Sequence, residues 1–306
     1  MQRYFLIKTG QSILLLLGVL ILVFFMIRIS GDPARLMLPR EASAEAVEAF
    51  REEMGFNRPL IVQFGDYFMG VLSGDFGDSL HFKSPALDLV LERLPATMQL
   101  AAVALLIAVV VGIPLGMIAG FNPGSVMDSV GRGLALLGQS IPNFWLALIL
   151  ILFFAVRLGL LPSFGRDEWK SVIMPAFVLG LPTIGQLVRL TRSAVLEIRG
   201  EDFIRTAHSK GLYPRTIYVK HVLRNVAIPL VTVIGVQFGY MLGGSIIIET
   251  VFAWPGIGQL LEQAIGWRDF PLVMAVAVFT SMVVLLINLL TDVAYAIIDP
   301  RIRYGH

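Results

Sequence analysis

Six long apolar runs dominate this sequence, at residues 10–29, 97–121, 133–158, 172–190, 226–248 and 272–298. A helix that crosses a hydrocarbon core about 30 Å thick needs roughly 20 mostly apolar residues, and each run is close to that length or longer. The run at 172–190 is the weakest because it contains Pro175, Pro182 and Gln186, which a bundle interior tolerates better than lipid does. The sequence therefore predicts an all-α integral membrane protein with about six transmembrane helices.

The composition agrees with a membrane environment. Of 306 residues, 56% are hydrophobic and 15% are charged, whereas soluble domains carry about a quarter charged residues. The chain has no cysteine, which excludes disulfides, thiolate metal sites and cysteine nucleophiles. The first run follows Arg3 and Lys8 as in a secretory signal, but no A-x-A-like cleavage site follows, so we expect a retained helix.

Basic residues gather between the fourth and fifth runs. Cytoplasmic loops retain positive charge, so this segment and both termini of the multi-pass chain are expected in the cytoplasm. The opposite face is expected to be acidic, with Glu249, Glu262 and Asp269 after the fifth run. The basic residues are Arg189, Arg192, Arg199, Arg205, Lys210, Arg215, Lys220 and Arg224.

The loop after the first run, residues 30–96, carries patterns of short helices. Val47, Phe50 and Met54 recur at helical spacing behind Ser43, a suitable N-cap, and Gly55 can end that helix. A second helix is expected to begin with Pro59 as its first residue and to run towards a turn at 74–77 through Ile61, Phe64 and Phe68. The chain is thus divided into residues 1–96, the first helix with an extracytoplasmic cap, and residues 97–306, the main transmembrane domain.

The segment at about 201–225 is predicted to form two short helices. Glu201 and Asp202 suit a helix N-terminus, Gly211 supplies a left-handed stop, and Pro214 can open a second helix that ends near Asn225. A short helix lying along the membrane is shaped to fit a groove on another protein. The alternative is a basic anchor for anionic lipid, and charge alone does not separate the two.

Part of this segment resembles a family motif. Arg205-Thr206-Ala207, Gly211 and Ile228-Pro229 are similar to the cytoplasmic loop of the inner-membrane components of binding-protein-dependent ABC importers. That resemblance implies a coupling helix that docks on an ATPase subunit. An acidic first motif residue is usual in the family, and Arg205 stands there instead, so an acidic contact is not carried over. The coupling residues implied are Glu201, Asp202, Arg205, Thr206, Ala207, Lys210, Gly211 and Leu212.

Further segments resemble the peptide, nickel and glutathione permeases of that family: residues 31–33, 74–77, 249–258 and 299–304. The resemblance covers essentially the whole chain and implies the type I ABC importer permease fold, in a bacterial inner membrane. It also implies a second permease, either a different chain or a copy of this one, two ATPase subunits and an extracytoplasmic binding protein. ATP and Mg are then expected on the ATPase subunits, with no cofactor on this chain and no nucleic-acid partner.

Two sets of membrane residues stand out. Small residues every four positions let helix backbones approach closely, which predicts packing faces at Gly112, Gly116, Gly120, Gly235, Gly239 and Gly243. The polar candidates for a translocation path within the runs are Gln139, Ser140, Asn143, Gln186, Gln237, Tyr240, Asn288 and Asp292. Because polar groups are costly in lipid, a translocation path is expected at Gln139, Asn143, Gln186, Gln237 and Tyr240. Asp292 is expected to contact a basic loop residue instead.

Several mechanisms lack their signatures. The sequence holds no G-x-x-x-x-G-K-[ST], no H-E-x-x-H and no G-x-S-x-G, so neither nucleotide hydrolysis nor an intramembrane enzyme is indicated. A secondary transporter would need acidic residues near the midplane, and Asp292 is the only one well inside a predicted run. We therefore expect a non-enzymatic permease subunit of an ATP-driven importer of di- or oligopeptides. Glutathione, nickel chelates and other small solutes are the alternatives.

Overall fold

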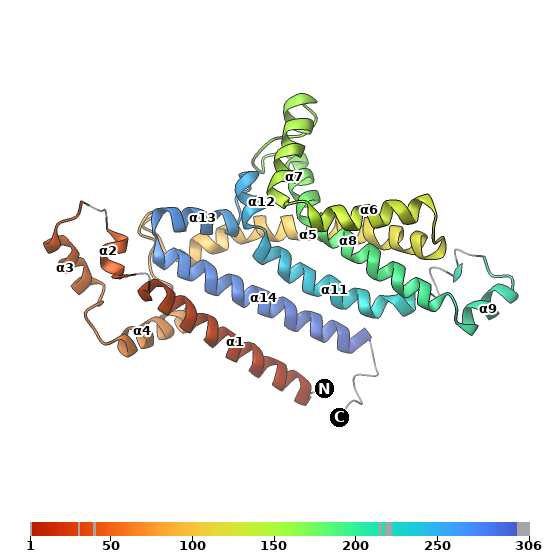
Figure 1. The fold of residues 1–306 in the computed structure, drawn as a ribbon. Helices are drawn as coiled ribbons and strands as arrows, with labels where there is room; N and C mark the ends of the chain where they lie inside the picture. The colour runs from red at the N-terminus through yellow and green to blue at the C-terminus, as the bar shows by residue number, and fades with distance from the viewer. Residues whose placement is uncertain (1, 30, 39–40, 214–215, 218–221, 299–306) are drawn as a thin grey trace. The chain divides into compact units, whose positions relative to one another are not determined.

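The computed structural model describes residues 2–29, 31–38, 41–213, 216–217 and 222–298 (Figure 1). Within these ranges the regular elements are helices, with one isolated antiparallel bridge between Asp78 and Pro85. The chain forms two compact units. The first unit comprises residues 1–97 and 255–285, and the second comprises residues 98–254 and 286–306. Residues 255–285 thus pack with the N-terminal part of the chain, a grouping that the division at residue 96 does not contain.

Four helices among the described residues are long and apolar enough to cross a membrane, and a bent helix pair raises this to five. They are α1 (Gln2–Ile29), α5 (Ala86–Phe121), α8 (Ile173–Ile198) and α14 (Phe270–Ile298), with the pair formed by α6 and α7. The remaining run lies in α11 (Leu223–Gly244), whose apolar part Pro229–Gly244 is shorter. The prediction of an all-helical membrane fold is confirmed.

The third run, at 133–158, is not one straight helix as expected. It is divided between α6 (Val126–Ser140) and α7 (Asn143–Leu150), which meet at 109°, and it continues as a π-helical segment, η1 (Ile151–Arg157). The bend falls at Ile141, which has extended backbone angles (φ −89°, ψ 125°). Pro142 explains this, because a proline disfavours helical angles in the residue before it. Apolarity alone did not reveal the bend.

The first unit has its own apolar core. Helix α13 (Ile257–Trp267) and the beginnings of α5 and α14 supply most of it, together with α1 and α4 (Leu60–Ser73). The buried side chains of this core are Leu20, Val71, Phe76, Ala86, Val90, Ile257, Leu260, Ala264, Leu272, Ala275, Val276 and Val278. Phe24 of α1 also stacks on Tyr67 of α4, with ring centroids 5.7 Å apart.

The loop helices of the first unit are α2 (Pro33–Met37), α3 (Ala44–Glu53) and α4. The predicted helix at α3 is confirmed: the Ser43 side chain accepts from the Ala46 N–H at 3.2 Å, and Gly55 follows with φ +69°. Helix α4 is also confirmed, with one correction. Pro59 is its N-cap rather than its first residue, because its ψ of 142° is extended.

The second unit is built around α8. In α8, 78% of the apolar window is buried within the molecule, against 28% in α5 and in α14. This burial explains why the weakest apolar run forms a central helix, since its proline and glutamine face protein rather than lipid. Helix α6 runs alongside α8, and α9 (Asp202–Ser209) lies just beyond its end (Figure 1). The unit also contains η2 (Trp169–Val172) and α12 (Ile246–Val251).

Candidate functional site

Helix α9 is a short amphipathic helix held at both ends. Asp202 lies in its first turn, where a negative charge favours the helix N-terminus. At the other end, Gly211 has φ +71°, and the Leu212 N–H donates to the Ala207 carbonyl at 3.2 Å. This is the hydrogen bond of a glycine-terminated helix, in which the left-handed residue turns the chain back. The predicted second helix from Pro214 lies partly outside the described residues.

The two sides of α9 differ sharply. Ile204 and Ala207 are 3% and 5% exposed and pack in the core of the second unit, which includes Val195 and Ile217. Of the predicted coupling residues, Ala207 therefore faces this chain's own core. The others lie exposed: Glu201, Asp202, Arg205, Thr206, Lys210, Gly211 and Leu212.

Sequence reasoning missed two exposed aromatic residues on this segment, Phe203 and Tyr213, which are 41% and 82% exposed. The helical period could have found Phe203. Phe203 lies one residue before Ile204 and four before Ala207, so the period places it at the edge of the buried face, where a large apolar side chain can be partly exposed.

Glycines of α5 lie against α8 at backbone distance. A Cβ added at Gly112 would stand 2.9 Å from the Leu187 Cβ, and one added at Gly116 would stand 2.7 Å from the Thr191 Cβ. At Gly120 the corresponding distance is 2.6 Å, to the Val195 Cβ. Any side chain at these positions would force the two helices apart, so the small residues set the α5–α8 spacing.

Helix α6 approaches α8 in the same way from another side. A Cβ at Gly138 would lie 2.7 Å from the Leu181 carbonyl oxygen, and one at Gly185 of α8 would lie 2.7 Å from the Ala135 Cα. The three helices therefore form one closely packed block, the α5–α6–α8 block. Because α9 follows α8 after three residues, this block is the part of the chain to which α9 is attached.

The second glycine set behaves less uniformly. Gly235 of α11 contacts the Thr291 side chain of α14, and Gly239 is buried. A Cβ built on Gly243 has no atom of the described residues within 4 Å. The predicted packing face is thus filled within this chain at one end and open at the other.

A buried ion pair joins α6 to α8. Asp128 is 1% exposed, and its carboxylate accepts from the Arg192 Nε at 2.6 Å and from the Gly124 N–H at 2.9 Å. The Arg192 Nη2 donates to the second carboxylate oxygen at 3.2 Å, so the pair is bidentate. Sequence reasoning missed this pair because its partners are 64 residues apart and Asp128 precedes the third apolar run.

Three of the five predicted path residues meet on one side of α8. The Arg189 Nη1 donates to the Gln139 Oε1 of α6 at 3.1 Å, and the Gln237 side chain of α11 donates to the Gln186 Oε1. Tyr240, one turn beyond Gln237, is 75% exposed. The other polar candidates are spread along their helices: Asn143 begins α7, Ser140 ends α6, and Asn288 and Asp292 lie in α14.

Arg189 and Arg192 occupy positions that the charge argument did not anticipate. Both were counted with the basic loop, but α8 extends to Ile198 and contains them. At a rise of about 1.5 Å per residue, Arg189 stands roughly 13 Å before the end of the helix. The basic loop proper therefore begins at Arg199.

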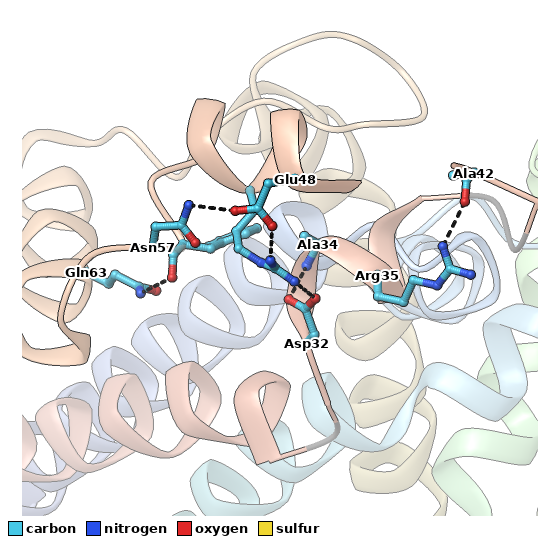
Figure 2. A network of polar contacts seen from close by, with 9 residues as sticks. Asp32, Ala34, Arg35, Ala42, Glu48, Asn57 and Gln63 are labelled. Carbon is cyan, nitrogen blue, oxygen red and sulfur yellow. Dashed lines mark hydrogen bonds and ion pairs between the residues drawn. The ribbon is translucent and has the colours of Figure 1, made fainter. Parts of the chain in front are cut away.

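A separate polar network holds the loop helices of the first unit (Figure 2). The Arg51 guanidinium donates to Asp32 at 2.6 Å and also pairs with Glu48, which accepts from Asn57 at 3.2 Å. Asp32 also caps α2 by accepting from the Ala34 N–H at 3.2 Å. The hydrogen bond to Asp32 raises the pKa of Arg51. The 31–33 motif thus ties α2 to α3.

The fold and these contacts define a class of protein: a helical membrane protein with closely packed spans and a short amphipathic helix beyond the most buried one. The profile of binding-protein-dependent transport system inner membrane components matches residues 112–304, and the profile of their N-terminal part matches residues 1–101. The chain therefore belongs to this family, the permeases of ABC importers.

Two individual relatives align with this chain over nearly their full length. The glutathione transport system permease protein GsiC of Salmonella choleraesuis (strain SC-B67) is 40% identical over 305 residues, 99% of this chain and 100% of that one. A putative peptide transport system permease protein of Brucella abortus (strain 2308) is 40% identical over 306 residues, 97% of this chain and 98% of that one. Among solved structures, the inward-facing MetNI methionine ABC transporter matches with a TM-score of 0.57 and 23% identity, covering 69% of this chain and 96% of that one. This last match shows a shared fold.

Proposed function

We propose that this chain forms half of the membrane pathway of an ATP-driven importer for di- or oligopeptides, with glutathione as the alternative substrate. The observation that carries the proposal is the full-length similarity, at 40% identity, to a glutathione permease and a putative peptide permease. Nickel chelates and other small solutes are further alternatives, because a separate binding protein is expected to select the substrate.

The proposed complex contains a second permease, which is either a copy of this chain or a similar one. Two ATPase subunits hold ATP and Mg on the cytoplasmic side, and a binding protein delivers substrate from outside. In this arrangement both termini and α9 are cytoplasmic, and the loop of α2, α3 and α4 is extracytoplasmic. The basic residues between α8 and α11 favour this orientation, because positive loops remain in the cytoplasm.

Helix α9 is the proposed coupling helix. Its inner side, with Ile204 and Ala207, is anchored in the core of the second unit, while Arg205, Thr206 and Lys210 are exposed. A partner that moves the exposed side therefore also moves the anchored side. Because α8 is closely packed against α5 and α6, the motion passes to three membrane helices together.

The cycle follows from this linkage. ATP binding closes the two ATPase subunits, the coupling helices follow, and the membrane helices change from inward-facing to outward-facing. Hydrolysis then resets the complex. Each step needs a difference in affinity between the two states, because a ligand shifts an equilibrium only by that difference.

The lipid-anchor alternative makes a different prediction for α9. A lipid anchor needs mainly basic residues at its surface, whereas the exposed side of this segment also carries Glu201 and Asp202, and Asp202 pairs with Arg205 at 3.4 Å. Mixed charge favours a protein partner.

Gly211→Pro tests the coupling role. Proline holds φ near −65° and cannot adopt the +71° of Gly211, so the end of α9 must rearrange. We expect the chain to remain in the membrane but the reconstituted complex to lose the ATP hydrolysis that loaded binding protein stimulates. Unchanged stimulation would refute the coupling role.

Gly200→Ala is the matched control. Gly200 precedes α9, has ordinary backbone angles and leaves room for a Cβ, whose nearest neighbour would be the Glu197 carbonyl oxygen at 3.9 Å. Stimulated hydrolysis should stay near the wild-type rate. A pull-down with Gly211→Pro adds a second measurement: loss of co-purified ATPase subunits supports a protein contact, and retention with normal stimulation supports the lipid anchor.

A further inference from the structure

Arg189 is a charged side chain inside a membrane-spanning helix. It is exposed on the surface of this chain although it lies nine residues before the end of α8. A charge at such a position is costly in lipid, so arginines within spans face protein or a water-filled path and mark functional sites. The exposed position of Arg189 within this candidate span therefore favours contact with protein or water over contact with lipid.

The contrast with Arg192, one turn further along the same helix, is informative. Arg192 is neutralised by the buried carboxylate of Asp128 at 2.6 Å. Among the described residues, the hydrogen bond of Arg189 goes instead to a neutral amide, that of Gln139. A guanidinium has five N–H donors, so Arg189 keeps both its charge and most of its donors for a further partner.

Neighbouring amides extend this site across three helices. Gln186 lies three residues before Arg189, which places the two side chains next to each other on one face of α8. Gln186 accepts from Gln237 of α11, and Gln139 comes from α6. Each amide offers two donors and an acceptor, more than these contacts use. The stripe thus combines the charge of Arg189, which pairs with no carboxylate in the described part of the chain, with groups that suit a peptide bond.

A planar guanidinium fork binds a carboxylate through two parallel hydrogen bonds. We propose that Arg189, supported by Gln139 and the Gln186–Gln237 pair, is a transit site for the carboxylate of an anionic, peptide-like substrate. This inference rests on the proposed importer function and specifies the substrate class for which the membrane path is suited. It also explains why α8 carries a positive charge that no carboxylate among the described residues neutralises.

The absence of cysteine makes a direct test possible, because Arg189→Cys introduces the only thiol. The complex, with its ATPase subunits and binding protein, is reconstituted in vesicles, and uptake of glutathione is compared with that of a dipeptide carrying a free or an amidated C-terminus. We expect Arg189→Cys to lower the uptake of the carboxylate probes at least tenfold and that of the amidated dipeptide far less.

Charge restoration identifies the cause of that loss. Reaction with 2-aminoethyl methanethiosulfonate returns a positive charge and should restore at least a third of the lost uptake, whereas the 2-sulfonatoethyl reagent should restore none. Equal uptake of free and amidated dipeptide after the substitution, or restoration by both reagents, would overturn the proposal. So would a thiol that neither reagent reaches, because the site would then not line a water-filled path.

Two further variants guard against a folding defect. Val110→Cys of α5 is the control: Val110 is 61% exposed in an apolar part of its span, and charged reagents should leave uptake unchanged. Arg189→Lys keeps the charge without the fork, so the KM for carboxylate probes should rise several-fold at a similar kcat. An equal fall in kcat for all probes would assign Arg189 a structural role. A wild-type complex that takes up no probe and shows no stimulated ATP hydrolysis would instead refute the importer function.

Discussion

Two regions of this chain are stabilised by different means. In the α5–α6–α8 block, helices approach until glycine Cα atoms meet the backbone of the next helix. In the loop helices α2, α3 and α4, long side chains span the gaps, with Arg51 joining Asp32 and Glu48, and Arg58 joining Asp66 at 3.1 Å.

The difference follows from the solvent of each region. Lipid tails are as apolar as leucine, so spans gain little from burying apolar side chains and associate through close dispersion contacts. In water, an exposed ion pair contributes little but is also cheap to form, and it can hold short helices that have small cores. Substitutions should therefore cost much in the block and little in the loop.

The largest effect is expected from Gly116→Leu. The Cβ of the new side chain would already lie 2.7 Å from the Thr191 Cβ and 2.8 Å from the Val188 carbonyl oxygen. The rest of the leucine needs still more room, so α5 must move away from α8. Overpacking of this kind costs about 3 kcal/mol. We expect a lower melting temperature of the detergent-solubilised chain, measured by size-exclusion chromatography after heating. We also expect the reconstituted complex to lose substrate uptake.

Gly133→Ala of α6 is the control for this prediction, since no atom lies within 4 Å of a Cβ built there. Its melting temperature should match that of the wild type. An equal fall in both variants would mean that glycine packing is not what distinguishes the block.

A smaller loss is expected from Asp128→Ala. The substitution leaves Arg192 without its carboxylate, and removing one partner of a buried pair is strongly destabilising. Because the Arg192 side chain is 26% exposed and can reach water in part, we expect about 2 kcal/mol. The melting temperature of the solubilised variant, compared with that of the wild type, measures this loss of stability.

The comparison pair for Asp128 is Asp202 with Arg205, whose side chains are 95% and 77% exposed. Asp202→Ala should change the melting temperature by less than the error of the measurement. Similar losses in the two variants would show that burial does not control the strength of these pairs.

Arg51→Ala probes the loop region. The side chains of Arg51, Asp32 and Glu48 are each at least 30% exposed, so salt screens the two ion pairs and their loss should lower the stability only slightly. We expect faster hydrogen exchange in α2 and α3 with unchanged exchange in α8. The difference between variant and wild type should shrink in high salt; a salt-independent difference would contradict this account.

The smallest effect, and the only stabilising one, is expected from Tyr67→Phe in α4. The Tyr67 hydroxyl is buried and has no hydrogen-bond partner among the residues that the structure describes, and burial raises the pKa of this phenol to about 12. Removing the hydroxyl should stabilise the chain by up to about 1 kcal/mol at neutral pH.

The advantage of Tyr67→Phe should grow with alkalinity. An unfolded phenol ionises near pH 10, whereas the folded one resists ionisation until about pH 12, so the wild type loses stability as the pH rises from 10 to 12. Phenylalanine has no ionisable group, so the variant does not lose stability in this way. Melting of both proteins at pH 8 and pH 11 checks it, and an unchanged difference would show that Tyr67 is not buried as described.

Local features were predictable because they depend on neighbours in sequence. Ser43 caps α3 and Gly211 adopts a positive φ because each effect acts within a few residues. The bend at Ile141 carried a local signal in Pro142, but the apolar run continued across it and hid the break. Arg189 was counted with the basic segment because Arg189 and Arg192 end the apolar run near Leu190, whereas α8 continues to Ile198.

The sequence by itself determined that this chain is a bundle of membrane-spanning helices with a basic segment between α8 and α11, because helix periodicity, span length and caps are local properties. Only the tertiary structure decided which charges are neutralised. Arg189 and Arg192 are one turn apart and chemically identical, yet one meets a buried aspartate and the other an amide. That choice depends on which residues of α6 the fold brings to α8, and no local pattern encodes it.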